Sequence, residues 1–321
     1  MNDGASRTEQ PVAPRGGLLV VHAHPDDETL TNGALLATWA AAGEPVTVVT
    51  CTRGERGEVI GEELAHLEGD GPALAAHREG ELAQALAALG VQGHDFLDGG
   101  PGVLDPRTAS DGVASPGTRY QDSGMAWVEP GVADRGAAVP DGAFVDVPLD
   151  EAAARLVALI ERSDPAVVVT YEPGGGYGHP DHVRAHEVVA RAGELLGDAC
   201  PELWWSVQPE SVVRTARSEL AAGSVPDGLS VPAADAALPS AVVPDEMLGD
   251  ALVVDVRPVL PALLAALRAH ATQVQCVAPI SGAAVIGRYA LSNDVLAPVL
   301  PVEVYLPRPA RRSRYRVRDG S

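Results

Sequence analysis

Residues 16–51, GGLLVVHAHPDDETLTNGALLATWAAAGEPVTVVTC, contain the pattern that decides the fold. The apolar, β-branched run at 18–22 predicts a buried strand that leads into the polar turn HAHPDDE. The Ala- and Leu-rich stretch at 33–42, which ends at Gly43, predicts a helix, and residues 46–51 predict a second strand. This succession of strand, helix and strand is typical of the right-handed βαβ unit of a parallel sheet.

The rest of the chain continues the alternation. Further helices are predicted at 77–89, 149–162 and 182–196, and a further strand at 166–171. The sequence therefore predicts an α/β fold: a Rossmann-like, doubly wound, mostly parallel sheet with helices on both faces. Beyond residue 200 the signals weaken to a strand at 203–207, a loop at 221–245 and a helix at 259–271.

These elements indicate one domain over residues 17–305. It comprises a Rossmann-like core (17–200) and a C-terminal elaboration (201–305), with a disordered tail at 1–16 and another tail at 306–321. The segment 98–147 is rich in Gly, Pro and Asp and lacks periodicity, which is typical of a functional lid or a disordered insertion.

Composition excludes several classes of partner. The chain carries 44 acidic and 23 basic residues, a formal net charge of −21, which repels nucleic acid and anionic membrane surfaces. Three scattered cysteines favour a reducing compartment. No apolar span approaches the roughly 18 residues of a membrane helix, and the N-terminus lacks a signal-peptide pattern, so we expect a soluble, cytoplasmic protein. The oligomeric state is left open.

The first polar turn offers His24, Asp26 and Asp27 at the end of a strand. An imidazole and a carboxylate presented together suit Zn²⁺ or a neighbouring first-row metal. By itself the cluster is more typical of a helix whose N-terminus is capped by Asp26 or Asp27 than of a metal site.

A second turn changes that balance. Residues 179–182 (HPDH) repeat the His-Pro-Asp pattern after the predicted strand at 166–171 and before a helical stretch, although Asp181 alone could be only a helix cap. Because ligands of open α/β sheets lie beyond the carboxyl ends of the strands, the two turns together favour a metal site.

A metal site of this kind favours hydrolysis. A three-ligand site with an open position lowers the pKa of its water toward about 7, and a neighbouring carboxylate can act as the base. Tyr177 and His179 follow the Gly174-Gly175-Gly176 loop and could donate to an oxyanion. No GxSxG elbow supports a serine nucleophile, and Cys51 is expected to be a buried structural thiol. Glu58, in an acidic loop after the second strand, could face substrate.

The paired motifs HPDDE (24–28) and HPDH (179–182) resemble those of the zinc-dependent N-acetylglucosaminyl deacetylases, which include the GlcNAc-PI de-N-acetylases. The similarity extends through TCTRGERGEVIG (50–61), RYQDSGMAW (119–127), VVVTYEPGGGYGHPDHV (167–183), HATQV (270–274) and ALSND (290–294), and covers most of residues 17–305. Segments around 100–145 and 205–255 match poorly.

The resemblance implies a role for each matching residue. His24, Asp27 and His182 would bind one Zn²⁺ per subunit, although Fe²⁺ suits two His and one carboxylate equally well. Asp26 would be the general base and His179 the general acid. Tyr177 would polarise the amide carbonyl, and Asp181 would orient His179. Glu58, Arg78, Asp122 and Met125 match positions that contact substrate.

Within the family, the pattern is most similar to the mycothiol-pathway branch. That branch implies a small pseudo-disaccharide substrate, N-acetylglucosaminyl-inositol, whose acetyl group is removed. Two alternatives stay open: an amidase acting on mycothiol S-conjugates, and a broader N-acetylglucosaminide deacetylase. The residues Thr31-Asn32-Gly33 and Gly178-His179 differ from the amidase pattern, which has Lys shortly after the acidic motif and Pro before the second His.

Overall fold

Among the residues that the structure describes, the main sheet has nine strands and is mostly parallel. In the computed structural model, which describes residues 10–100, 102–104, 119–129, 132–135 and 139–308, the strand order is β1-β10-β14-β8-β7-β2-β3-β4, with β9 paired to β8. The run β8-β7-β2-β3-β4 is parallel throughout, whereas β14 is antiparallel to both neighbours. The strands are Gln10–Pro11 (β1), Gly17–His22 (β2), Val46–Thr50 (β3), Gly93–Phe96 (β4), Pro165–Tyr171 (β7), Glu202–Pro209 (β8), Val242–Val243 (β9), Leu252–Asp255 (β10) and Val302–Pro307 (β14).

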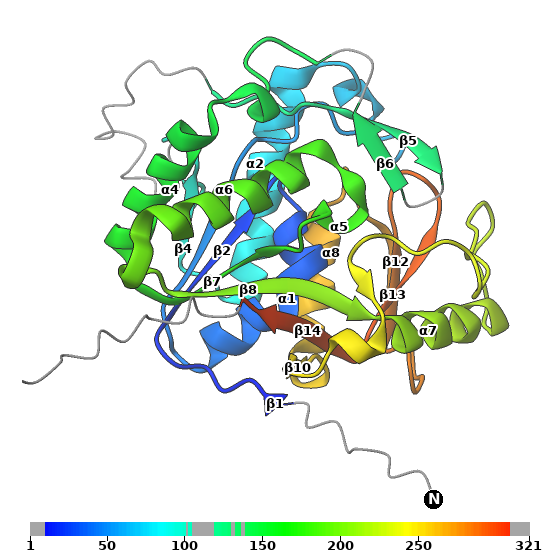
Figure 1. The fold of residues 1–321 in the computed structure, drawn as a ribbon. Helices are drawn as coiled ribbons and strands as arrows, with labels where there is room; N and C mark the ends of the chain where they lie inside the picture. Colours follow the sequence, from blue (N-terminus) through cyan, green and yellow to red (C-terminus); the bar gives the residue numbers. More distant parts are fainter. Residues whose placement is uncertain (1–9, 101, 105–118, 130–131, 136–138, 309–321) are drawn as a thin grey trace, which may run out of the picture.

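Helices cover both faces of this sheet (Figure 1). Because side chains alternate along a strand, Leu18 and Val20 of β2 pack into one core and Leu19 and Val21 into the other. The first core includes α1 (Asp27–Ala41), α2 (Gly71–Leu89) and α8 (Leu260–Ala269); the second includes α4 (Leu149–Ser163) and α6 (Pro180–Leu196). The predicted doubly wound α/β architecture is confirmed.

The order of the strands places the site. From β2 the chain passes through α1, β3 and α2 to β4, and it later returns to β7 on the opposite side of β2. The connections that follow β2 and β7 therefore leave the sheet in opposite directions. Such a switch point opens a crevice at the carboxyl ends of the two strands, where ligands of this fold class bind.

The C-terminal part is integrated into the same body. It supplies β10 and β14 to the main sheet, and α8 packs against α1 and α2. It also forms α7 (Glu210–Ala222) and a small antiparallel sheet of β11 (Gln275–Pro279), β12 (Gly287–Ala290) and β13 (Leu296–Val299). These elements lie together on one side of the molecule in Figure 1, beside the carboxyl ends of the parallel strands.

Several boundaries differ from the sequence-based predictions. Helix α1 begins at Asp27, whereas the sequence predicted a start at residue 33; Asn32 has a non-helical conformation that divides the helix there. Helix α2 begins at Gly71 rather than at residue 77, and Asp70 caps it by accepting a hydrogen bond from the Ala73 N–H. Helix α7 and the strand pair β5 (Met125–Glu129) and β6 (Val132–Arg135), inside the 98–147 segment, were not predicted.

The expected terminal tails are only partly described. Strand β1 lies within the expected tail 1–16, and β14 ends within the expected tail 306–321. Residues 1–9 and 309–321 lie outside the described residues, as do 101, 105–118, 130–131 and 136–138 of the long segment 98–147.

Candidate metal centre

The two His-Pro-Asp turns meet at the switch point. The first follows β2 and leads into α1, and the second follows β7 through the short helix α5 (Gly175–Gly178) and leads into α6. His24, Asp27 and His182 come from these turns and are all buried. The sequence prediction that the two motifs lie together is therefore met in the fold.

Three side-chain atoms form a nearly equilateral triangle. His24 Nδ1, Asp27 Oδ2 and His182 Nε2 are 3.3 Å apart in every pair. Zinc–ligand bonds of about 2.0–2.1 Å in a tetrahedral arrangement place ligand atoms about 3.3–3.4 Å apart. Although burial opposes ionisation, His182 and His24 hold the pKa of Asp27 well below its usual range. These donors fit one small divalent cation.

The other nitrogen of each ligand histidine is also fixed. His182 Nδ1 lies 3.1 Å from the Gly175 carbonyl oxygen, which accepts its proton and leaves Nε2 for a metal. His24 Nε2 lies 3.2 Å from Asp181 Oδ2. Asp181 is held in turn by Ser123, whose N–H and hydroxyl donate to its two oxygens at 2.9 and 2.5 Å. Such outer contacts set the tautomer and the orientation of a metal-binding imidazole.

The position of Asp181 differs from the sequence-based prediction. Its carboxylate contacts His24, and only its backbone N–H donates to His179 Nδ1, at 3.1 Å. His179 thus caps α6, and the carboxylate of Asp181 does not. Because the turn brings the carboxylate beside His24, the carboxylate orients a candidate metal ligand, and the Asp181 N–H holds the candidate acid His179.

His179 lies close to the triangle. Its ring centroid is 4.6 Å from that of His24 and 4.9 Å from that of His182, so these three histidines form a second possible ligand set. His24, Asp122, His179 and Asp181 also have potential ligand atoms within 4.8 Å of one another. Burial, with the neighbouring His24 and His182 rings, lowers the pKa of His179 well below its usual value.

Asp26 adopts an unusual backbone conformation, with φ 111° and ψ −34°. Its side chain makes no capping hydrogen bond to α1, so it is free of the capping role that the sequence left open. Its carboxylate is 3.3 Å from Arg78 Nη2. Burial raises the pKa of Asp26 to about 7, against the opposing charge of Arg78. Strained, buried carboxyls of this kind are found at functional sites.

The buried pair of Glu28 and His270, which was not predicted from the sequence, holds the backbone of Asp26. Glu28 Oε2 accepts from the Asp26 N–H at 2.9 Å, and Glu28 Oε1 lies 2.7 Å from His270 Nε2. Glu28 and His270 are both fully buried. Although burial opposes both charges, the pairing lowers the pKa of Glu28 and raises that of His270. The sequence signals were that Glu28 ends the HPDDE motif and that His270 begins the HATQV motif.

Tyr177 lies beside the triangle, at the boundary with the two cavities. Its ring centroid is 4.9 Å from that of His182, and its side chain lines both cavities at the site. Burial and the neighbouring carboxylate of Asp27 raise the pKa of Tyr177 well above its usual value, so the hydroxyl keeps its proton. The preceding loop is held by Glu172, which accepts from the Gly176 N–H at 2.8 Å and from the Ser240 hydroxyl at 2.8 Å.

A polar pocket of about 170 Å³ opens on the Asp26 side of the triangle. Its walls contain all four predicted substrate contacts: Glu58, which is exposed, half-buried Met125, and buried Arg78 and Asp122. They also contain Arg56, Gln273 and Ser292, which sequence reasoning missed.

Arg78 has a role beyond the predicted one. Its guanidinium donates to the backbone carbonyls of Gly54, at 2.6 Å, and of Pro25, in addition to its ion pair with Asp26. Arg78 thus ties the loop after β3 to the turn after β2 and positions Asp26.

Comparison with known proteins identifies the family of the chain. Residues 19–193 match the family described as GlcNAc-PI de-N-acetylase (PIG-L). The chain belongs to this family. Among its relatives, a protein of Kineococcus radiotolerans named 1D-myo-inositol 2-acetamido-2-deoxy-alpha-D-glucopyranoside deacetylase is 46% identical over 300 residues, 90% of this chain and 76% of that protein. A Streptomyces avermitilis protein of the same name is 43% identical, over 91% of this chain and 92% of its own.

Solved structures are more distant. A deacetylase–teicoplanin complex is 21% identical with a TM-score of 0.47, covering 80% of this chain and 87% of its own. The N,N'-diacetylchitobiose deacetylase of Pyrococcus horikoshii is 20% identical with a TM-score of 0.43, covering 80% of this chain and 70% of its own. In this member of the family, no helix among the described residues is both long and apolar enough to cross a bilayer.

Proposed function

We propose that this chain is a zinc-dependent deacetylase of mycothiol biosynthesis. It hydrolyses the acetamide of N-acetylglucosaminyl-inositol and gives glucosaminyl-inositol and acetate. The observation that carries the proposal is the 3.3 Å triangle of His24, Asp27 and His182, with the carboxyl of Asp26 and the hydroxyl of Tyr177 beside it. The names of the curated relatives support the substrate.

One metal ion per subunit would be held by His24, Asp27 and His182. When bound, it would polarise the amide carbonyl and lower the pKa of the attacking water. The two imidazoles and one carboxylate suit Zn²⁺, and Fe²⁺ is accommodated by the same donors.

The proton transfers belong to the protein. Asp26, whose carboxyl faces the polar pocket and whose pKa is raised to about 7 by burial, accepts a proton from water as the carbon–oxygen bond forms. Tyr177 donates its O–H to the developing oxyanion. The carbon–nitrogen bond then breaks as the amine receives a proton from His179. Because burial lowers the pKa of His179, this imidazole is neutral before the reaction, and the proton that it passes on is the one that Asp26 took from water.

The polar pocket accounts for the substrate side of the reaction. Glu58, Asp122 and Met125 line a space suited to the hydroxyls of a sugar and an inositol. We assign the amine half of the substrate to this pocket.

The test is acetate release by the purified, metal-loaded protein, with and without a chelator. N-Acetylglucosaminyl-inositol is compared with N-acetylglucosamine and with a mycothiol S-conjugate. We expect chelator-sensitive release that is fastest with the inositol substrate. Faster cleavage of the conjugate would instead identify a conjugate amidase, and equal rates on N-acetylglucosamine a broader deacetylase.

Two variants separate the base from the ligands. Asp26→Asn is expected to lower kcat by about 10²- to 10⁴-fold with the metal retained, because general-base assistance has that magnitude. His182→Ala is expected to lose metal. The matched control, Asp198→Asn, changes an exposed carboxylate and should behave as wild type. A fully metallated His182→Ala protein, or near-normal turnover of Asp26→Asn, would overturn these assignments.

A further inference from the structure

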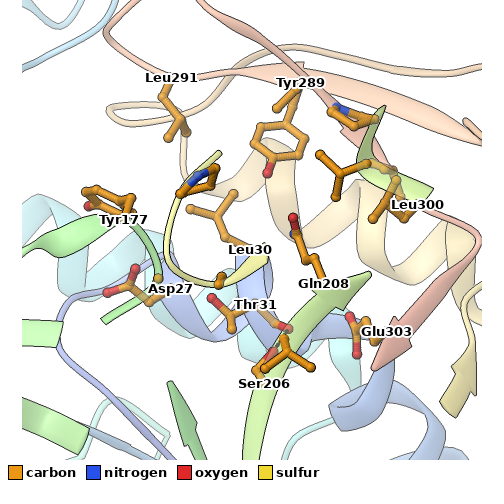
Figure 2. Close-up of a pocket in the computed structure, with 18 of the residues that line it drawn as sticks. Asp27, Leu30, Thr31, Tyr177, Ser206, Gln208, Tyr289, Leu291, Leu300 and Glu303 are labelled. Carbon is orange, nitrogen blue, oxygen red and sulfur yellow. Dashed lines mark hydrogen bonds between the residues drawn. The ribbon is translucent and has the colours of Figure 1, made fainter. Parts of the chain in front are cut away.

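A second and larger cavity opens on the other side of the triangle. Its volume is about 310 Å³, against about 170 Å³ for the polar pocket. Asp27, Leu30, Tyr177 and Leu291 line both spaces, so the two cavities meet at the candidate metal ligand and the candidate oxyanion donor. Figure 2 shows this cavity extending from Asp27 and Tyr177 toward Leu300 and Glu303.

This cavity lies where the acyl half of a bound amide substrate is expected. The reacting carbonyl carbon has two substituents, the amine half and the acyl half. With the amine half in the polar pocket beside Asp26, the acyl half points away from it, past Asp27 and Tyr177. That direction leads into the larger cavity.

The walls suit a hydrocarbon chain. They come largely from the C-terminal part of the chain and include Leu263 and Leu267 of α8, Tyr289 of β12, Val299 of β13, and Leu300. Burying a methylene group against such walls is favourable by about 0.8 kcal/mol, or about fourfold in an equilibrium constant.

Two polar groups in the walls, those of Glu303 and Ser206, are hydrogen-bonded within the protein. At the far end, the Glu303 carboxylate accepts from the N–H groups of Ala34 and Leu35, both at 2.8 Å, and from the Tyr305 hydroxyl at 2.7 Å. The hydroxyl of Ser206 lies 3.4 Å from the Thr31 carbonyl oxygen, to which it donates. An apolar ligand would leave these hydrogen bonds in place.

The volume exceeds the need of an acetyl group. An apolar protein cavity of about 150 Å³ accommodates benzene, so about 310 Å³ has room for an acyl chain of at least six carbons. The methyl group of acetate would fill only the end nearest Asp27.

We propose that the larger cavity is an acyl-binding site, and that the protein hydrolyses N-acyl glucosaminides carrying unbranched acyl chains longer than acetyl. The proposal rests on the deacetylase function proposed above. The reaction is the same hydrolysis: water adds to the carbonyl carbon, the carbon–nitrogen bond breaks, and a fatty carboxylate and a free amine are released. No further reactant is required.

The test uses the acetyl, butanoyl, hexanoyl and octanoyl derivatives of glucosaminyl-inositol, with released amine as the common readout. We expect kcat/KM to rise from acetyl to hexanoyl by up to about fourfold per methylene. Hexanoate should inhibit hydrolysis of the acetyl substrate at lower concentration than acetate does. A steady fall in kcat/KM with each added methylene would overturn the proposal.

Variants in the wall make the test specific. Leu300→Trp narrows the far end of the cavity and should lower kcat/KM for the hexanoyl substrate at least tenfold while changing that for the acetyl substrate less than twofold. Ser206→Leu, on the opposite wall in Figure 2, provides a second variant with the same expected selectivity. Leu195→Trp, at an exposed position of α6, is the matched control.

The outcomes distinguish the two proposals. Equal losses for acetyl and hexanoyl substrates in both wall variants would reject the acyl site alone. Absence of chelator-sensitive amine release from every substrate, acetyl included, would reject the deacetylase function on which the acyl site depends.

Discussion

Replacing Glu28 tests whether the pair formed with His270 holds the candidate base in position. Asp26 has a backbone φ of 111°, a conformation that costs a non-glycine residue about 1–3 kcal/mol. It is retained in part by the hydrogen bond from the Asp26 N–H to Glu28, at 2.9 Å. A hydrogen bond to a charged group contributes about 1.5–3 kcal/mol, which corresponds to about 10- to 100-fold in the population of the positioned carboxyl.

Two effects are therefore expected of Glu28→Ala. The unfolding free energy should fall by about 3–5 kcal/mol, because His270 is left buried without its partner. In the protein that remains folded, kcat for deacetylation should fall about 10- to 100-fold at little change in KM, because the polar pocket itself is intact. Glu28→Gln keeps an oxygen acceptor for the Asp26 N–H, so its unfolding free energy and its kcat should both fall less than those of Glu28→Ala.

The assay combines urea unfolding, steady-state kinetics and metal analysis on the same preparations. Glu161→Ala, at an exposed position of α4, controls for loss of a carboxylate. If Glu28→Ala is folded and fully metallated and its kcat lies within threefold of wild type, the positioning argument is wrong. A double-mutant cycle with His270→Gln should show non-additive losses, since the two side chains form one buried unit.

Three further changes probe the surroundings. Ser123→Ala removes the hydroxyl that donates to Asp181 and should weaken metal affinity about tenfold, measured by competition with a chromophoric chelator. Gly175→Ala should lower the unfolding free energy by about 1–3 kcal/mol, because φ is +68° and the new Cβ would lie 2.7 Å from the Val183 backbone nitrogen. It should also lower metal affinity, because the Gly175 carbonyl that orients His182 would be displaced. Burial lowers the pKa of His94 to about 3, so its neutral form contributes stability that is complete above pH 6.5 and declines as the pH falls. In urea unfolding, the difference in unfolding free energy between wild type and His94→Asn should shrink by about 1.4 kcal/mol between pH 7.5 and pH 5.5. A difference that stays constant with pH would contradict the assignment.

Local patterns in the sequence were enough to predict the fold class and the location of the site. Periodicity and helix stops are local signals, so the strand at 18–22, the following helix and the strand at 46–51 could be recognised from residues that are neighbours in the chain. The two His-Pro-Asp turns were placed together because each follows a strand, and parallel strands present their carboxyl ends at one edge. Residues His24, Asp27 and His182 follow from that argument with the family resemblance.

The contacts that support these side chains depend on how distant parts of the chain pack together. Glu28 meets His270 across 242 positions of sequence, and Ser123 meets Asp181 across 58, from a segment without periodicity. No local pattern encodes such pairs, because each depends on how separate elements pack. For the same reason the carboxylate of Asp181 contacts His24, while its backbone N–H donates to His179.

The larger cavity is the feature that the sequence indicated least. Its walls come largely from the C-terminal part of the chain, where sequence signals were weakest because the strands are short and the loops are rich in Ala and Pro. An apolar residue in such a segment can equally well fill a core or line a space. Only the packing of α8, β12 and β13 beside the carboxyl ends of the parallel strands leaves about 310 Å³ open next to Asp27.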